Sequence, residues 1–228
     1  MSPEEFQLPL AFNVGAVFFF ALTGALGARR LGYDFIGVFV LAFATGLGGG
    51  LLRDALLRSA GPVVALTNPR FILAVLLATC CGLLRFSARI ETFNRVIAGL
   101  DAVGLGAFAV VGTQQALAAN LHWLAAVLVG VANAIGGGLL RDVLTRREPL
   151  LFKPGQFYAL AALLGTLVYA GLRLEFHFPS LWAALWATVA TVVFRVLAII
   201  FNWKTRAVEA PVESPCPPHN PLAADSQT

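Results

Sequence analysis

Charged side chains are scarce in this sequence, and their scarcity limits the classes of protein that it can form. Asp, Glu, Lys and Arg make up 12% of the 228 residues, whereas soluble domains carry roughly 25%. The formal charge of +4 comes from arginines spread between apolar runs, and they form no basic face of the kind that binds nucleic acid. We therefore expect neither a soluble domain nor a nucleic-acid partner.

Cysteines and catalytic motifs are also few. The cysteines are Cys80, Cys81 and Cys216, and their spacing fits neither a zinc site nor a disulfide framework. The sequence has no zinc-protease His-Glu-x-x-His, no Gly-x-Ser-x-Gly elbow and no phosphate-binding loop. We therefore expect no enzyme, no structural metal site and no cofactor. The first ten residues contain Glu4 and Glu5 but no basic residue, so the first apolar run is expected to be retained rather than cleaved as a signal peptide.

Long apolar runs dominate what is present. Apolar residues make up 58% of the chain, its mean hydropathy is +0.80, and a membrane-spanning helix needs about 20 mostly apolar residues. The pattern predicts an all-α polytopic membrane protein with a seven-helix transmembrane domain over residues 1–204. The proline-rich residues 205–228 are predicted to be a disordered cytoplasmic tail. The seven predicted spans are 12–28, 35–57, 71–86, 96–117, 123–144, 156–172 and 181–203.

One seven-residue motif, Gly-Gly-Gly-Leu-Leu-Arg-Asp, occurs twice, beginning at Gly48 and at Gly136. The same offset of 88 residues aligns Phe20 with Phe108 and Asn13 with Asp101. The first three spans, about 12–86, therefore look like a duplicate of the next three, about 96–172, and the seventh span stands outside the duplication. Because three is odd, the second copy enters the membrane from the opposite side, which predicts inverted repeats.

Basic residues are distributed unevenly between the two sides that seven spans create. Lys and Arg concentrate in cytoplasmic loops, and the larger set faces inward when the N-terminus is outside. The sequence therefore predicts an outer N-terminus and a cytoplasmic C-terminus. The inner set is Arg29, Arg30, Arg85, Arg89, Arg95, Arg141, Arg146, Arg147, Lys153, Lys204 and Arg206, and the outer set is Arg53, Arg58, Arg70 and Arg173.

The two glycine triplets interrupt apolar spans. Each glycine weakens a helix by about 1 kcal/mol relative to alanine, so three in a row predict a kink or a short unwound stretch in spans two and five. Carbonyl groups freed there can face a cavity and coordinate a cation. The alternative is close helix packing, since small residues let two backbones approach. The triplets are Gly48, Gly49 and Gly50, and Gly136, Gly137 and Gly138.

An arginine and an aspartate follow each triplet, as Arg53–Asp54 and Arg141–Asp142. Charges at membrane depth are costly and usually serve function. Neighbours on a helix point about 100° apart, so each arginine is expected to project toward a central cavity and to meet a partner on another helix, with its aspartate capping or pairing nearby. The alternative is a pair of snorkelling residues near span ends with a structural salt bridge.

Four further polar residues occupy matching places in the repeats. Asn13 and Asp101 are equivalent, and Asp101 is expected to attract cations or take a proton, or else to be a helix-start residue that interacts with the helix dipole. Thr45 and Asn133 precede the triplets and are candidates for polar pore lining. Arg195, in the last span, is expected to reach the cytoplasmic surface and its lipid headgroups.

The paired motif in a seven-span chain with two inverted three-span repeats resembles the prokaryotic branch of the trimeric intracellular cation channel family. The resemblance covers residues 12–203. It implies a homotrimer with one hourglass pore in each subunit, lined by spans two and five, bent at the glycines, together with spans one and four. It also implies passive permeation of potassium and sodium ions and, in a bacterium, a place in the plasma membrane. The Lys-Glu-Val motif of animal members is absent, so their lipid and calcium regulation is not implied.

A second interpretation stays open beside the channel. Sequences of this kind are also described as glycine transporters, and arginines that repel cations in a pore would suit an amino-acid carboxylate. A secondary transporter of a small amino acid such as glycine is therefore the alternative, and a membrane enzyme or lipid-binding protein is a third class without supporting motifs. The expected ligands are transported potassium or sodium ions and bound membrane lipid.

Overall fold

The computed structural model describes residues 8–57, 68–84, 90–153, 157–201 and 203, which contain no β-strand. The predicted all-α architecture with seven helices is confirmed. The predicted disordered tail, 205–228, lies outside the described residues. The helices are α1 (Leu10–Arg30), α2 (Phe35–Leu57), α4 (Pro69–Leu83), α5 (Ile90–Ala118), α6 (Trp123–Leu144), α7 (Tyr158–Leu174) and α8 (Ser180–Ile200).

Helix length separates the seven into two groups. Among the described residues, α1, α2, α5, α6 and α8 are long and apolar enough to cross a membrane, whereas α4 and α7 are apolar but shorter. At 1.5 Å of rise per residue, α4 and α7 span about 23 and 26 Å, against a hydrocarbon core of about 30 Å. Helices α2 and α6 begin and end where the apolar runs do. Helix α5 begins at Ile90 rather than at residue 96, because hydropathy marks membrane depth and not the end of helical hydrogen bonding.

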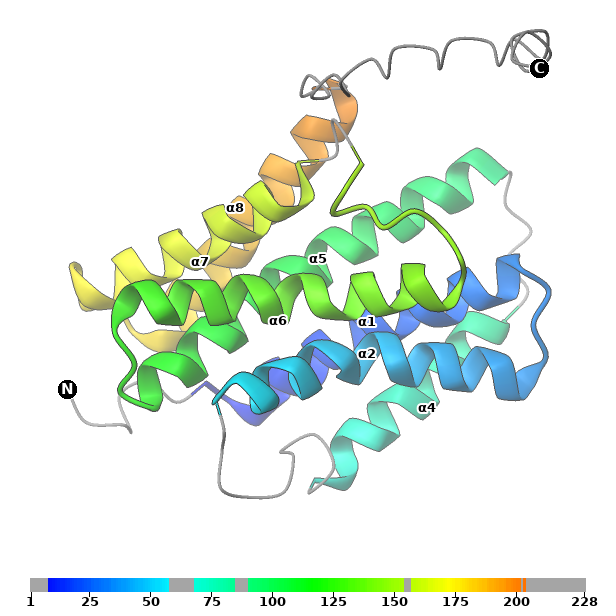
Figure 1. Ribbon diagram of the computed structural model, residues 1–228, viewed down its shortest axis with the longest axis horizontal. Coiled ribbons are helices and arrows are strands. Elements are labelled where there is room, and N and C mark those ends of the chain that lie inside the picture. The colour runs from blue at the N-terminus through cyan, green and yellow to red at the C-terminus, as the bar shows by residue number, and fades with distance from the viewer. Residues whose placement is uncertain (1–7, 58–67, 85–89, 154–156, 202, 204–228) are drawn as a thin grey trace, which may run out of the picture.

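The helices form two three-helix groups that pack against each other. Helices α1, α2 and α4 contact one another, as do α5, α6 and α7, while α8 packs on α5 and α7 (Figure 1). Between the groups, α2 packs along α6 and α1 packs along α5. The groups correspond to the two sequence repeats, with α8 as the extra helix.

The duplication extends to the turns that join the first two helices of each group. Gly32 and Asn120, which are 88 residues apart, both have left-handed backbones, with φ values of 75° and 58°. Glycine adopts this conformation without strain, and asparagine is the residue that best replaces it. The same backbone hydrogen bond spans each turn, from Tyr33 N to Ala28 O at 3.2 Å and from Leu121 N to Ala116 O at 3.1 Å.

The glycine triplets lie where α2 and α6 pack against each other. A Cβ atom on Gly49 would lie well within 3.0 Å of the carbonyl oxygen of Asn133, and one on Gly137 equally close to that of Thr45. These two contacts are equivalent, since 88 residues separate both Gly49 from Gly137 and Thr45 from Asn133. Glycine is required here because any side chain would separate the two backbones.

The predicted unwinding at the triplets is wrong. Helices α2 and α6 are continuous through Gly48–Gly50 and Gly136–Gly138, so helical hydrogen bonding is kept and no carbonyls are freed by a break. The predicted kink is not confirmed. The physical reason is that tight packing against the opposite helix supports the helical backbone, which offsets the weak helix propensity of glycine.

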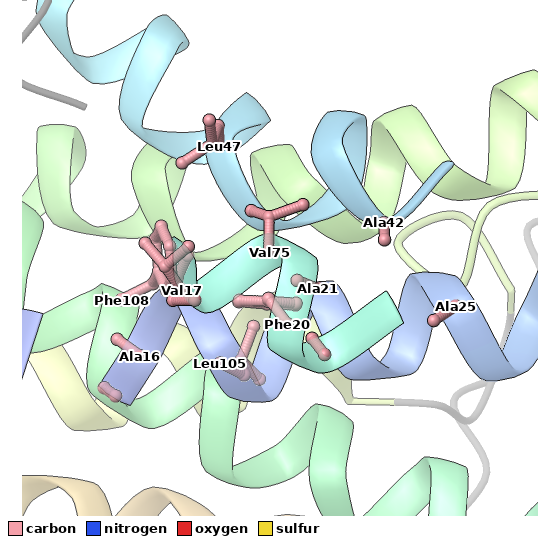
Figure 2. Close-up of a cluster of buried hydrophobic side chains, with 14 of the residues drawn as sticks. Ala16, Val17, Phe20, Ala21, Ala25, Ala42, Leu47, Val75, Leu105 and Phe108 are labelled. Carbon is pink, nitrogen blue, oxygen red and sulfur yellow. The ribbon is translucent and has the colours of Figure 1, made fainter. Parts of the chain in front are cut away.

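Aromatic side chains fill the space beside the triplets. Phe20 of α1 and Phe108 of α5 meet edge to face, with ring centroids 4.9 Å apart, and both are buried. Figure 2 shows them within a cluster that also includes Val17, Leu105 and Val75, from α1, α5 and α4. The centre of the molecule is therefore apolar and closely packed.

The surface of the bundle is more apolar than that of a soluble protein, and several charged side chains are buried. Large apolar side chains face outward, such as Leu128, Trp182 and Trp186, which are 62%, 58% and 59% exposed. Charged side chains are inside, including Arg53 and Arg141, which are 4% and 7% exposed. This distribution suits a molecule surrounded by lipid rather than water.

Candidate ion pathway

A large cavity, with a volume of about 290 Å³, lies at one end of the helix bundle. It meets the second half of α1, the first half of α5 and the end of α6, together with the α6–α7 connection and α8. Five of its eight charged lining residues lie within positions 141–153, and the other three, Arg30, Asp101 and Arg195, come from α1, α5 and α8. The polar and charged residues that line this large cavity are Thr23, Arg30, Asn94, Asp101, Arg141, Asp142, Thr145, Arg147, Glu148, Lys153 and Arg195.

Arg141 is the centre of a polar network in this large cavity. Its Nη1 donates to Asp101 Oδ1 of α5 at 2.8 Å and to Thr23 Oγ1 of α1 at 3.2 Å, while its Nε donates to Asp142 Oδ1 at 3.0 Å. Asp142 Oδ2 also accepts from the backbone N–H of Leu150 at 3.1 Å. A single guanidinium therefore connects α1, α5 and α6, and its charge is matched by two carboxylates.

Two buried polar atoms near this network have no hydrogen-bond partner among the described residues, Asp101 Oδ2 and the hydroxyl of Tyr158. Arg195 of α8 lies over the Tyr158 ring, 5.1 Å from its centroid, and lines the same cavity. Arg195 is 3% exposed, so the expectation that it reaches the surface is wrong. The favourable contact of a guanidinium with an aromatic face holds it inside.

A second, small cavity of about 30 Å³ lies on the other side of the Phe20–Phe108 contact. It meets the first half of α1, the second half of α5 and the end of α2. Arg53 lines it, and this arginine donates from Nε and Nη2 to Oδ1 of the adjacent Asp54 at 2.8 and 2.6 Å. The other lining residues are Asn13, Ala16, Val17, Gly46, Leu47, Gly50, Phe71, Phe108, Val111 and Gln115.

The two cavities are related by the internal duplication. Four residues of the large cavity have their equivalents, 88 positions away, in the small cavity: Thr23 with Val111, Gly27 with Gln115, Asp101 with Asn13, and Arg141 with Arg53. The large cavity meets the end of α1 and the beginning of α5, whereas the small cavity meets the beginning of α1 and the end of α5. The cavities therefore open toward opposite ends of the bundle, as inverted repeats require.

Both aspartates pair nearby, as predicted, but among the described residues the predicted partner on another helix is found for Arg141 and not for Arg53. Arg141 meets Asp101 on another helix, as expected, but it also pairs with its neighbour Asp142. Arg53 pairs with its neighbour Asp54, which the argument from helix geometry disfavoured. An arginine side chain is long enough to turn back along the helix surface, so adjacent positions do not prevent pairing. Neither arginine snorkels to the surface, since both are buried.

Thr45 and Asn133 lie at the contact between α2 and α6 and line neither cavity. Thr45 Oγ1 donates to Leu41 O within α2 at 2.6 Å, and Asn133 Nδ2 donates to Phe108 O of α5 at 2.6 Å. Gly48, Gly49, Gly136 and Gly137 are likewise buried in this contact, whereas Gly50 lines the small cavity and a Cβ atom on Gly138 would meet the Tyr158 hydroxyl of α7. Asp101 is within α5 rather than at its start, so its interpretation as a helix-start residue is wrong.

Sequence reasoning missed Thr23, Tyr158 and Gln115 as residues of this region and misplaced Arg195. The offset of 88 contains a signal for some of them, because it sets Thr23 against Val111 and Gln115 against Gly27, pairs that differ in polarity and in size. Within the part of the chain that the structure describes, no group of three His, Cys, Asp or Glu side chains could hold a metal ion. Chemically, the arrangement offers two polar cavities at opposite ends, separated by an aromatic contact.

Comparison with known proteins identifies relatives of this chain. A family model described as "Glycine transporter" matches residues 10–86 and again residues 98–173, which are the two repeats. The chain is 34% identical over 185 residues to the inner membrane protein YadS of Escherichia coli, covering 81% of this chain and 88% of that one. It is 35% identical over 195 residues to the membrane protein YvgT of Bacillus subtilis, covering 84% and 92%.

Solved structures with the same fold are cation channels by their descriptions. The trimeric intracellular cation channel orthologue from Rhodobacter sphaeroides is 32% identical, with a TM-score of 0.75, covering 84% of this chain and 97% of that one. A prokaryotic channel of the same kind, solved in 0.5 M KCl, is 27% identical, with a TM-score of 0.77, covering 85% and 96%. The likeness extends over nearly the whole length of both structures.

Proposed function

This chain belongs to the family that the glycine transporter model describes, with trimeric intracellular cation channels among its solved relatives, and on that premise we propose that it is a cation channel. The proposed channel is passive, conducts potassium and sodium ions, and has one hourglass pore in each subunit. The observation that carries the proposal is the pair of cavities, which share four equivalent lining positions and open toward opposite ends, with the packed contact of Phe20 and Phe108 in the core of the bundle.

Electrostatics supports cations as the permeant species despite the buried arginines. A lone positive charge would repel cations, but Asp101 and Asp142 both lie within hydrogen-bonding distance of Arg141. Asp101 Oδ2 accepts no hydrogen bond from any described residue, and a buried carboxylate oxygen of this kind calls for water or a cation. We assign Asp101 the role of attracting cations and Arg141 the role of holding the closed arrangement.

The assembly and orientation belong to the same proposal. The Rhodobacter sphaeroides relative is described as trimeric, and we propose a homotrimer for this chain. The charge distribution along the sequence supports an outer N-terminus and a cytoplasmic C-terminus in a bacterial plasma membrane. In this orientation, the large cavity faces the cytoplasm, because Arg30, Arg147 and Lys153 at its mouth belong to the inner set of basic residues.

The test of the channel is potassium flux into proteoliposomes that contain the purified full-length protein, followed by recording in planar bilayers. We expect flux that does not saturate at low potassium concentration and current in discrete steps. Protein-free liposomes and liposomes with a heat-denatured preparation are the controls. Absence of both flux and current from correctly assembled protein would contradict a channel.

A secondary transporter of a small amino acid is the second candidate, and one observation favours it. The large cavity is lined by side chains of both charges, including Arg195 and Arg147 beside Asp101 and Glu148, and an amino acid carries one charge of each sign. The same proteoliposomes distinguish the candidates. Saturable exchange of labelled glycine without current steps would support the transporter, and lack of glycine exchange in protein that conducts potassium would exclude it.

A further inference from the structure

The two cavities share four equivalent wall positions but differ about tenfold in volume, about 290 against 30 Å³. Position 27 on α1 and position 115 on α5 are equivalent and line the two cavities, yet one is glycine and the other is glutamine. The other equivalent pairs in the lining are much closer in size: Asp101 with Asn13, Thr23 with Val111, and Arg141 with Arg53. The largest difference in side-chain size thus occurs at positions 27 and 115.

The space at Gly27 is open. A Cβ atom built on Gly27 would come no closer than 3.9 Å to any neighbour, the nearest being Cδ of Arg141. This is ordinary van der Waals contact, so backbone packing does not demand glycine at this position. The missing side chain leaves room directly beside the aliphatic part of the buried arginine.

The equivalent space at position 115 is occupied. Gln115 is partly buried on α5 and lines the small cavity together with Arg53, Gly50 and Asn13. Gln115 thus places a side chain in the wall of the small cavity at the position equivalent to Gly27, which has none. Glutamine has an amide carbonyl and an amide N–H group, so it gives this wall a polar surface that water and ions tolerate.

We propose that Gln115 is the residue that narrows the second vestibule and limits access to Arg53 from that end of the bundle, and that Gly27 keeps the first vestibule wide. The effect of Gln115 on ion current rests on the proposed channel function, whereas the effect of Gln115 on access to the cavity does not. The size of the side chain at position 115 decides how easily a small solute enters the small cavity, and the polarity of that side chain is secondary.

Access is tested by the rate at which an engineered thiol reacts with a small cationic methanethiosulfonate, in full-length protein in liposomes with Cys80, Cys81 and Cys216 replaced by alanine. Ala16→Cys reports on the small cavity, which Ala16 lines. We expect Gln115→Gly to raise the labelling rate of this thiol severalfold. Gln115→Leu, which keeps the size but not the polarity, is the matched control and should label as slowly as the parent.

A glutamine placed at position 27 tests whether side-chain size also controls access to the large cavity. Ala98→Cys reports on the large cavity, and Gly27→Gln is expected to slow its labelling severalfold, because the new side chain would occupy the space beside Arg141. If Ala16→Cys prevents assembly, as judged by size-exclusion chromatography, Asn13→Cys replaces it as the reporter, since Asn13 lines the same cavity.

The outcomes separate this proposal from the function on which it partly rests. Equal labelling of the small-cavity thiol with glutamine and with glycine at position 115, or fast labelling with leucine, would overturn it. In a parent protein that conducts potassium, Gln115→Gly is expected to increase current and Gly27→Gln to reduce it. A parent that carries no current but keeps the labelling pattern would overturn the channel and leave the role of Gln115 standing.

Discussion

Arg53 and Arg141 occupy equivalent positions in the two repeats, but their surroundings differ at several equivalent positions, of which positions 13 and 101 bear on ion pairing. Position 101 is aspartate and its equivalent, position 13, is asparagine. Arg141 consequently forms an ion pair between helices, while Arg53 pairs with Asp54 on its own helix. A single change of carboxylate to amide thus leaves one arginine tied to a neighbouring helix and the other tied within its own.

The contacts of the two arginines predict unequal losses of stability. Arg141→Ala leaves Asp101 and Asp142 buried without their counter-charge, and breaking a buried ion pair in this way typically costs about 3–5 kcal/mol. We expect a clearly larger fall in the thermal unfolding temperature for Arg141→Ala than for Arg53→Ala. Fluorescence-detected size-exclusion chromatography after heating measures it. Arg141→Lys keeps the charge but loses the multiple donors, and it should fall between the parent and Arg141→Ala.

The same residues predict a change in transport. If Arg141 holds the closed arrangement through Asp101, Asp101→Asn should weaken that hold and increase potassium flux in proteoliposomes, because the equivalent repeat already has asparagine without such an ion pair. Arg53→Ala and Arg141→Ala are expected to alter flux in protein that still assembles. Potassium flux unchanged in all three variants would show that these residues do not contribute to the ion pathway.

At the scale of the helices, the glycine triplets act through packing and not through a break. Gly49 lies against the carbonyl of Asn133, and Gly137 against that of Thr45. The rings of Phe108 and Phe20 lie beside these glycines, 3.2 Å from the Cβ position of Gly49 and 3.8 Å from that of Gly137. The triplets thus bring α2 and α6 together and leave room for the aromatic pair that separates the cavities.

Alanine substitution tests this role for the helices. Gly49→Ala and Gly137→Ala force a methyl group into a backbone carbonyl, and overpacking of this kind costs about 1–3 kcal/mol. Gly171→Ala on α7 is the matched control, because its Cβ would meet nothing within 4 Å and alanine favours a helix. We expect lower unfolding temperatures for the first two variants and an equal or higher one for the control. Destabilisation by Gly171→Ala as large as theirs would contradict the packing explanation.

At the scale of the whole molecule, the duplication gives the chain a cavity toward each end, with four equivalent positions in the two linings. The large cavity meets the end of α1 and the beginning of α5. The small cavity meets the beginning of α1 and the end of α5. Opposite insertion of the two repeats accounts for this arrangement, and α8 packs on the second repeat, through α5 and α7. Arg195 reaches the large cavity from α8, so the extra helix itself makes the two ends different.

Opposite insertion predicts that equivalent positions lie on opposite sides of the membrane. Leu31 and Ala119 are both exposed, 88 residues apart, at the ends of α1 and α5. In a background without native cysteines, a membrane-impermeant maleimide should label Ala119→Cys in intact cells and Leu31→Cys only after permeabilisation. Labelling of both from the same side would overturn the inversion, whereas exchanged sides would reverse the proposed orientation alone.

The proposed homotrimer predicts the mass of the purified complex. Crosslinking of the purified protein, or native mass spectrometry in detergent, should return three copies of the 24.2 kDa chain. Large apolar side chains remain exposed on α4 and α8, such as Leu73, Leu77 and Trp186, which suits contact with either lipid or a second copy. A stable monomer or dimer under conditions that preserve potassium flux would exclude the homotrimer.

The sequence by itself determined the membrane class, the seven helices and the duplication, because these depend on hydropathy and on an offset that can be read along the chain. It located Arg141 and Asp101 for the same reason, since intramembrane charge is visible without coordinates. Only the tertiary structure decided how Arg53 pairs, that the glycines pack instead of unwinding, that Gln115 and Arg195 line the cavities, and that Tyr158 lies against Arg195. These outcomes depend on which helices meet and how closely, and spacing along one chain does not contain that information.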